Sequence, residues 1–231
     1  MMIFAISDLH LNAKGDKPMD IFGGNWEGYL DAIKASWTAS VSSEDVVLIA
    51  GDISWAMNLD DAMKDIQAIA ALPGKKVIIR GNHDYWWNSY NKLTQALPEG
   101  IYALQNNALR FGDTIICGTR GWDIASDNSS EEDKKIYARE LIRLELALED
   151  MKKLRKDGDT VIGMIHYPPF SVRRENSGFT ALFSRYGVDK VVYGHLHGKD
   201  VLVYPYVKLE GVEYYLTSCD LVNNKLVKIA Q

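Results

Sequence analysis

Short apolar runs recur along this chain, and most of them are followed directly by a polar cluster. Several runs are continuous rather than alternating, which is typical of central strands covered on both faces and therefore of a layered α/β fold. Two later runs, residues 207–218 and 225–230, contain turn signals and predict an antiparallel section that completes the fold. The earlier runs cover residues 2–6, 46–50, 76–79, 115–117, 160–165 and 190–193.

Between the runs, apolar residues recur at spacings of three and four, as on the buried face of an amphipathic helix. Asn58 is placed to cap the second of these helices, and Ser129 or Ser130 to cap the third. We expect the third helix to lie across a sheet. The predicted helices cover residues 26–41, 59–70 and 131–156.

The composition is that of an ordinary globular protein. With 231 residues, 47% of them hydrophobic, we expect a single domain over residues 1–231. The apolar runs are far shorter than the ~20 residues of a membrane span, and the opening stretch lacks the pattern of a secretory signal. We therefore expect a cytoplasmic protein with no membrane partner, in which Cys117 and Cys219 are buried thiols. The net charge is −5 and the basic doublets are scattered, so nucleic acid is not the expected partner.

All five histidines lie in the polar clusters, together with aspartate, asparagine and glycine. Because the carboxyl ends of parallel strands line up along one edge of a sheet, residues far apart in sequence are delivered to one place. In Asp-x-His and His-x-His, side chains two positions apart in an extended segment point the same way, and the glycines allow close backbone approach. The clusters are Asp8-Leu9-His10, Gly51-Asp52, Gly81-Asn82-His83-Asp84, His166 and Gly194-His195-Leu196-His197.

The donors in these clusters are imidazole, carboxylate and amide oxygen, a mixture that suits Mn, Fe or Zn ions. One tetrahedral ion cannot use so many ligands, whereas two ions that share a bridging carboxylate can. A single histidine or aspartate can be explained as a structural residue or a cap, but the clusters together favour a metal centre. We predict two divalent metal ions per chain, with the ligands Asp8, His10, Asp52, Asn82, His166, His195 and His197.

The complete set of motifs, in this order from Asp8 to His197, resembles the calcineurin-like metallophosphoesterases. The resemblance implies an α/β (α+β) fold in which two mixed β-sheets pack as a sandwich flanked by helices, a four-layer αββα architecture. It implies that Asp52 bridges the two ions. The other ligands would divide into Asp8, His10 and His197 for the first ion and Asn82, His166 and His195 for the second.

The same resemblance implies a phosphohydrolase that cleaves a phosphomonoester or phosphodiester by in-line attack of a metal-bridging hydroxide. His83 would stabilise the transition state or protonate the leaving group, and Asp84 would fix the tautomer and orientation of His83. The expected partner is a small phosphorylated substrate, and the oligomeric state stays open. The alternatives are a nuclease of the same family and a non-catalytic scaffold with the same fold, which the intact ligand set disfavours.

The sequence leaves open whether some further residues near the strand ends have a functional or a structural role. Arg120 and Arg173 follow strand ends, where they could contact a phosphate, although surface positions are commoner for arginine. For Trp55, Trp86 and Trp87, we favour packing near the mouth of the site over stacking on a substrate, and the role of the neighbouring Tyr85 stays open.

Overall fold

The structure, a computed structural model, describes residues 1–198 and 201–231. The helices of the described residues are α1 (Tyr29–Ser40), α2 (Leu59–Ala70), α3 (Tyr90–Ala96), α4 (Glu131–Leu154) and α5 (Gly178–Arg185), with short 3-10 turns η1 (Asp20–Phe22) and η2 (Gly24–Trp26). None of these helices is long and apolar enough to cross a membrane. The strands are β1 (Ile3–Ile6), β2 (Val46–Ile49), β3 (Lys75–Ile79), β4 (Ile101–Leu104), β5 (Asn107–Phe111), β6 (Thr114–Thr119), β7 (Thr160–Ile165), β8 (Lys190–Tyr193), β9 (Tyr206–Leu209), β10 (Val212–Leu216) and β11 (Val227–Ala230).

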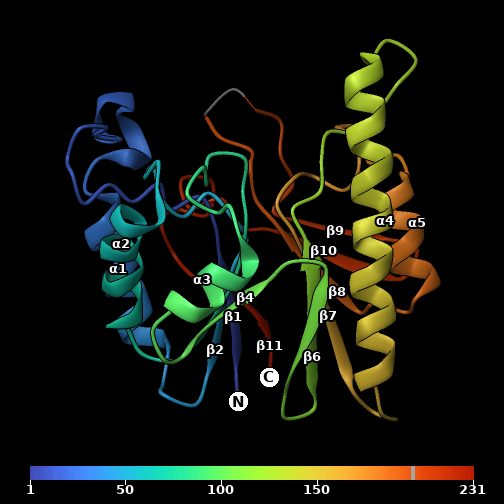
Figure 1. Cartoon of the computed structure of the whole chain (residues 1–231), viewed down its shortest axis with the longest axis horizontal. Helices are drawn as coiled ribbons and strands as arrows, with labels where there is room; N and C mark the ends of the chain where they lie inside the picture. The colour runs from blue at the N-terminus through green and yellow to red at the C-terminus, as the bar shows by residue number, and fades with distance from the viewer. Residues whose placement is uncertain (199–200) are drawn as a thin grey trace.

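The strands form two mixed sheets that face each other (Figure 1). One sheet has the order β11-β1-β2-β3-β4, and the other has the order β5-β6-β7-β8-β10-β9. The inner neighbours pair parallel, whereas β11, β5 and β9 pair antiparallel at the edges. In Figure 1, α1, α2 and α3 lie outside the first sheet and α4 and α5 outside the second. This arrangement confirms the predicted αββα sandwich.

Three apolar cores hold the four layers together. One core joins the first sheet to its helices, through residues such as Ile49 and Trp37. A second joins the other sheet to α4 and α5, through residues such as Val161 and Leu148. The third fills the space between the two sheets and includes Leu48. Because alternate residues of β2 face different cores, the strand is buried on both sides, which explains its continuous apolar sequence.

Several local predictions are confirmed. The earlier apolar runs all contain strands, and residues 207–218 form the antiparallel hairpin of β9 and β10. The Asp61 N–H donates to Asn58 Oδ1 at 3.0 Å, which caps α2. Ser130 caps α4 by accepting from the Asp133 N–H at 3.1 Å. The thiols of Cys117 and Cys219 are free and buried.

Other predictions need correction. The helix predicted over residues 26–41 begins only at Tyr29, because Gly28 adopts a left-handed backbone with φ 61° and separates it from η2. In the first turn of α1, Leu30 is 41% exposed, and Tyr29 is the apolar residue that is buried. The terminal strand β11 pairs with β1 in the first sheet, whereas β9 and β10 belong to the second. The chain therefore returns to the first sheet at its end.

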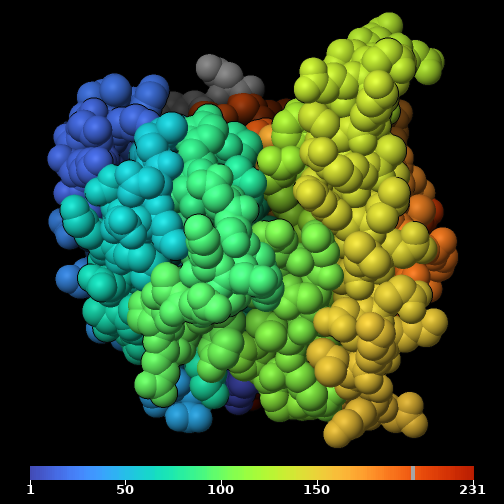
Figure 2. Space-filling view, in the orientation of Figure 1, coloured from blue at the N-terminus to red at the C-terminus, as the bar shows by residue number. Residues whose placement is uncertain are grey.

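The cyan, green and yellow segments that run from α2 to α4 form most of the face of the molecule shown in Figure 2. The two sheets are joined at the ends of β1 and β10. The Ser7 N–H donates to Thr217 O at 2.8 Å, and the Cys219 N–H donates to Ser7 O at 3.1 Å. These bonds bring the carboxyl ends of strands from both sheets to a common edge.

Candidate metal centre

Polar side chains from both sheets meet at the edge where β1, β2, β3, β7 and β8 end. We call the seven predicted ligands at this edge the donor rim: Asp8, His10, Asp52, Asn82, His166, His195 and His197. Their side-chain atoms are separated by 3.2 Å for Asp8–His197, 3.9 Å for His10–Asp52, 3.6 Å for Asp52–His166, 2.7 Å for His166–Asn82 and 2.9 Å for Asn82–His195. The His195 N–H completes the ring of contacts by donating to both carboxylate oxygens of Asp8 at 3.1 Å.

Two groups within the donor rim bring three donor atoms within 4.8 Å of one another. One consists of Asp8, His10 and His197, and the other of Asp8, Asp52 and His166. Asp8 belongs to both groups. Asp52 Oδ2 approaches one histidine of each group, at 3.9 Å from His10 Nε2 and 3.6 Å from His166 Nε2. Each group is a candidate site for a divalent cation.

The contacts of Asn82 provide the most specific sign of a cation. His166 Nδ1 lies 2.9 Å from Ala50 O, and because a carbonyl only accepts, Nδ1 carries the proton of the neutral ring. Its Nε2 then presents a lone pair to Asn82 Oδ1 at 2.7 Å. His195 Nδ1 lies 2.9 Å from the same oxygen. Two imidazole nitrogens and an amide oxygen thus converge at one point, and these donor types fit a metal ion.

Asp220 is a functional candidate that the sequence analysis missed. His197 Nδ1 donates to Asp220 Oδ1 at 2.8 Å, and the Gly198 N–H donates to Asp220 Oδ2 at 3.1 Å. His197 Nε2 is thereby directed into the site, where it lies 3.2 Å from Asp8 Oδ1. A carboxylate behind a histidine in this way fixes the ring for metal binding. The one available signal was that Asp220 closely follows the predicted strand over residues 207–218.

The electrostatics of the donor rim also suit cations. Burial, followed by the negative charges of Asp8 and Asp84, raises the pKa of Asp52 to about 9. Burial lowers the pKa of His10 to about 3 and that of His195 to about 4, so both rings are neutral at physiological pH. Neutral imidazoles are the metal-binding form of histidine. His197 is the exception, because burial lowers its pKa but the hydrogen bonds to Asp220 and Asp8 raise it to about 10, so a metal ion would replace the proton on its Nε2.

Four residues of the donor rim have a left-handed backbone. The φ angles are 60° for Asp8, 45° for His10, 51° for Asp52 and 73° for His195. This conformation is unusual for residues other than glycine and clusters at functional sites. It also corrects one step of the prediction: Asp8 and His10 do not share a face of an extended segment. Each instead occupies a turn after β1 that directs its side chain into the rim.

Two glycines are required by close approach, as predicted. A Cβ atom on Gly81 would lie 2.1 Å from Asp52 Oδ1, and one on Gly194 would lie 2.4 Å from Asp8 Oδ2. Neither distance is compatible with a side chain, so the carboxylates pack directly on the glycine backbone. The two glycines therefore allow Asp52 and Asp8 to occupy their positions.

The predicted pairing of His83 with Asp84 is wrong. Asp84 is fully buried, and its carboxylate accepts from the N–H groups of Ile53, Ser54 and Gly81 at 2.7–3.1 Å. His83 Nδ1 has no hydrogen-bond partner among the described residues. Backbone N–H groups thus satisfy the carboxylate that was expected to orient the His83 ring. Asp84 instead fixes the turn that carries Asn82 and His83 to the loop after β2.

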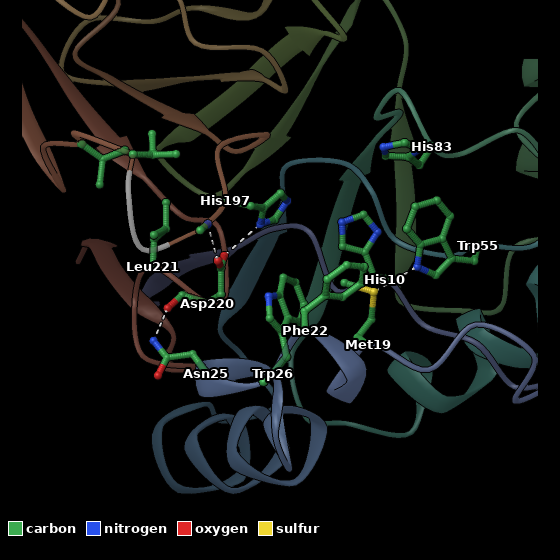
Figure 3. A pocket seen from close by; sticks show the side chains of 14 residues that line it. His10, Met19, Phe22, Asn25, Trp26, Trp55, His83, His197, Asp220 and Leu221 are labelled. Carbon is green, nitrogen blue, oxygen red and sulfur yellow. Dashed lines mark hydrogen bonds and ion pairs between the residues drawn. The ribbon is translucent and has the colours of Figure 1, made fainter.

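A cavity of about 790 Å³ opens above one side of the donor rim (Figure 3). His10, His83 and His197 line its base. Trp55 stacks on His10 with ring centroids 4.7 Å apart and lies 4.5 Å from the His83 ring. The remaining wall is mostly apolar and includes Met19, Phe22, Trp26, Val201, Val203 and Leu221. The cavity thus joins polar groups at its base to an apolar wall.

The other open residues divide between packing and surface positions. Trp86 and Trp87 are buried, which confirms the packing role, whereas Tyr85 is exposed. Arg173 is exposed on the loop after β7. Arg120 lies beside the buried Glu140 of α4, with a nitrogen–oxygen distance of 3.6 Å.

Two facing mixed sheets and a rim of aspartate, histidine and asparagine define an α/β sandwich protein with a candidate metal centre. The sequence model of the family described as calcineurin-like phosphoesterase matches residues 1–199, and the chain belongs to this family. No match was found among curated proteins.

Among solved structures, the chain is similar to TT1561 of Thermus thermophilus, with 13% sequence identity and a TM-score of 0.62 over 99% of this chain and 97% of that one. It is also similar to a protein of unknown function, AQ665 from Aquifex aeolicus, with 17% identity and a TM-score of 0.49 over 98% and 95% of the two chains. The likeness to the Thermus protein shows the fold alone.

Proposed function

We propose that this protein is a hydrolase of phosphate esters that works with two divalent cations. Asp8, His10 and His197 would hold one cation, and Asn82, His166 and His195 would hold the other, with Asp52 shared between them. The observation that carries the proposal is the contact of Asn82 Oδ1 with the nitrogen atoms of His166 and His195, at 2.7 and 2.9 Å. When bound, divalent cations supply positive charge to phosphoryl oxygens and lower the pKa of water near the phosphorus atom.

The residues of the chain contribute position and hydrogen bonds to this reaction. The Asp220 carboxylate holds His197 in one tautomer, and the Ala50 carbonyl does the same for His166. Asp84 holds the turn that presents His83. These buried supports keep the donor atoms in fixed positions before a substrate arrives, which reduces the reorganisation needed in the transition state.

His83 is the group best placed to act on the substrate itself. Its ring lines the cavity beside His10, and its Nδ1 has no partner within the described chain. Burial lowers the pKa of His83, so a neutral ring with one N–H is the resting form. We propose that this N–H donates to a phosphoryl oxygen, and that the negative charge of the bound phosphate raises the pKa of His83, so that the ring takes up a second proton from water. The ring would then give one proton to the leaving oxygen and return to its neutral form.

The cavity wall narrows the substrate class. The aromatic and aliphatic side chains around Trp55 have few polar partners for a sugar or polyol. Because such surface gains most from covering apolar groups, we propose that the alcohol part of the ester is aromatic or aliphatic. An aryl or alkyl phosphate is then hydrolysed with a higher kcat/KM than glycerol phosphate.

The proposal is tested by measuring bound metal and hydrolysis on the same samples. The panel contains aryl and alkyl phosphate mono- and diesters, glycerol phosphate, DNA and RNA, each with Mn²⁺ supplied. Asp52→Asn should lose bound metal and turnover, whereas His83→Ala should lose turnover and keep the metal. Asp45→Asn is the matched control, because Asp45 is a buried carboxylate that accepts from the Met2 and Ser42 N–H groups at the opposite ends of the strands.

The outcomes separate the candidate functions. Metal loss from the Asp52 variant alone, with hydrolysis of small esters, agrees with the proposal. Faster cleavage of DNA or RNA than of every small ester favours the nuclease. Absence of metal from the wild-type protein, or equal metal loss from the His83 and Asp52 variants, contradicts the assigned roles.

A further inference from the structure

A second cavity, which we call the arginine pocket, lies between the end of the first sheet and helix α4. It has a volume of about 250 Å³ and is polar, in contrast to the cavity above His10. In Figure 2, the green segments and the yellow helix that contribute to it adjoin each other on the visible face. Its lining consists of Arg80, Asn88, Leu104, Gln105, Asn106, Thr119, Arg120, Arg139 and Arg143.

The pocket gathers far more positive charge than the protein around it neutralises. Four of its lining residues are arginines, in a chain with a net charge of −5. Among the described residues, the carboxylate paired with them is Glu140, whose oxygen lies 2.6 Å from Arg143, 3.6 Å from Arg120 and 4.0 Å from Arg139. A single carboxylate against four guanidinium groups leaves a surplus of three positive charges.

Two of the guanidinium groups also have unused hydrogen-bonding capacity. The Nε atoms of Arg80 and Arg120 are buried and have no partner among the described residues, and the Arg120 side chain as a whole is only 18% exposed. A buried charged donor without a partner is costly. Burial lowers the pKa of Arg120, and the positive charges of Arg80 and Arg143 also lower it, whereas the negative charge of Glu140 acts in the opposite direction. An anion bound in the pocket would therefore stabilise these buried guanidinium groups.

Two amide side chains of the lining are also oriented as donors. The side-chain oxygen of Gln105 accepts from Trp87 Nε1 at 2.8 Å, and that of Asn106 accepts from Thr119 Oγ1 at 3.0 Å. With both oxygens used, the NH₂ groups of the two amides are left as donors. A pocket of guanidinium and amide donors is complementary to an anion with several acceptor oxygens.

We propose that the arginine pocket binds a phosphate group. Planar guanidinium groups pair with two phosphate oxygens at once, and clusters of arginine are the usual protein receptors for phosphate. The phosphate belongs either to a second position of the substrate or to a separate molecule, and the same residues serve both.

Two segments that line the arginine pocket adjoin or contact residues of the donor rim. Arg80 is followed directly by Gly81 and Asn82, and the Arg120 carbonyl accepts from the His166 N–H at 2.9 Å. A ligand in the pocket therefore contacts segments that carry rim residues. The pocket is distinct from the rim in its chemistry, because it contains no carboxylate or imidazole donor among its lining residues.

Phosphate binding is measured by calorimetry with inorganic phosphate and the manganese-loaded full chain. The test variant is Arg139→Gln/Arg143→Gln, which changes two side chains on the outer part of α4. Its matched control is Lys152→Gln/Lys153→Gln, which removes the same charge from exposed positions of the same helix. Asp52→Asn is included to remove the share of phosphate that binds at the metal centre.

We expect Asp52→Asn to retain one phosphate site. In that background, the arginine variant should weaken phosphate binding at least about tenfold, since it removes two charged donors, and the lysine variant should change it less than about twofold. Glu140→Gln should strengthen binding, because it removes the competing carboxylate. A merely destabilised protein would not gain affinity, so this variant distinguishes the proposal from a loss of fold.

A kinetic comparison identifies the source of the phosphate. The KM of an aryl monophosphate is compared with that of the same ester carrying a second, tethered phosphate. A KM at least about tenfold lower for the bisphosphate, lost in the arginine variant, identifies a second substrate phosphate. Equal KM values with retained calorimetric binding identify a separate phosphate-bearing molecule.

Two results would overturn the proposal. One is the absence of phosphate binding in Asp52→Asn, and the other is an arginine variant that binds phosphate as well as the lysine variant. The calorimetric test does not depend on the proposed hydrolase activity, because it needs no turnover. A protein that hydrolyses none of the esters and still binds phosphate in the pocket would contradict the proposed function alone.

Discussion

Replacing Asp220 with asparagine should weaken metal binding at the end of the donor rim formed by Asp8, His10 and His197. Asp220 belongs to neither donor group, but both of its oxygens are used, one by His197 Nδ1 and one by the Gly198 N–H. An asparagine offers only one accepting oxygen, so one of these two donors would face an NH₂ group. The His197 ring would lose its fixed tautomer and orientation.

The size of the effect follows from the role of the contact. Burial lowers the pKa of His197, but the hydrogen bonds to Asp220 and Asp8 raise it to about 10. Asp220 therefore supports the ring electrostatically as well as geometrically. Loss of a hydrogen-bonded carboxylate behind a metal-binding histidine weakens metal affinity about 10–100-fold, which corresponds to about 1.4–2.7 kcal/mol. Removal of the ring in His197→Ala should cost more.

The assay is competition for Mn²⁺ or Zn²⁺ with a fluorescent chelator, performed on the wild type and on Asp220→Asn, His197→Ala and Asp45→Asn. Asp45→Asn carries the same change in a buried carboxylate far from the rim and should bind metal like the wild type. Circular dichroism verifies that each variant is folded. If Asp220→Asn binds metal as tightly as Asp45→Asn while His197→Ala does not, the supporting role of Asp220 is refuted.

Three further predictions test the site and the scaffold separately. In the metal-free protein, Asp52→Asn should be more stable to urea than the wild type. The difference should widen as pH rises from about 4 towards the raised pKa of about 9, because ionisation of the buried carboxylate favours unfolding. Bound metal should make the wild type the more stable protein, and an unchanged order of stability would count against the site. Gly81→Ala should abolish metal binding with near-native circular dichroism, because its Cβ would lie 2.1 Å from Asp52 Oδ1; retained metal would be inconsistent with that packing. Ser130→Ala should lower the free energy of unfolding in urea by about 1 kcal/mol through loss of the α4 cap, with metal content unchanged.

The parts of the fold that could be predicted are those in which local sequence and tertiary environment agree. Strand β2 is buried on both faces, so its four residues are all apolar. Helix α4 has both an apolar stripe and a serine cap, and its predicted extent differs from the structure by two residues at one end. The donor rim could be predicted because parallel strands necessarily end along the same edge.

The missed elements carry weaker local signals. Helix α3 has seven residues and buries only Leu93, and α5 follows a loop in which its capping serine, Ser177, is one polar residue among several. Strand β4 has an exposed residue, Tyr102, within its apolar sequence. Short elements of this kind are stabilised by their tertiary contacts rather than by their own propensity.

The misassigned side chains show a different limit. Asp84 adjoins His83 in sequence, yet its carboxylate accepts from N–H groups of a loop about thirty residues away and from the Gly81 N–H. Asp220 reaches His197 because β10 pairs with β8, a contact between distant segments. Sequence adjacency identifies which residues are available, but hydrogen-bond competition in the folded chain decides which of them meet.

The strained backbone of the donor rim depends on the apolar cores that pack against the strands carrying it. A left-handed conformation costs a residue such as Asp8 or His10 roughly 1–2 kcal/mol, and Asp52 adds the cost of a buried carboxylate. Local preference alone would relax these turns and separate the donors. The strands that carry them are instead packed on both faces, so the turns can relax only if buried apolar contacts are lost. The sheets therefore hold the rim in its binding geometry. A bound cation would offset part of the free energy that the left-handed turns and the buried carboxylate cost the folded protein.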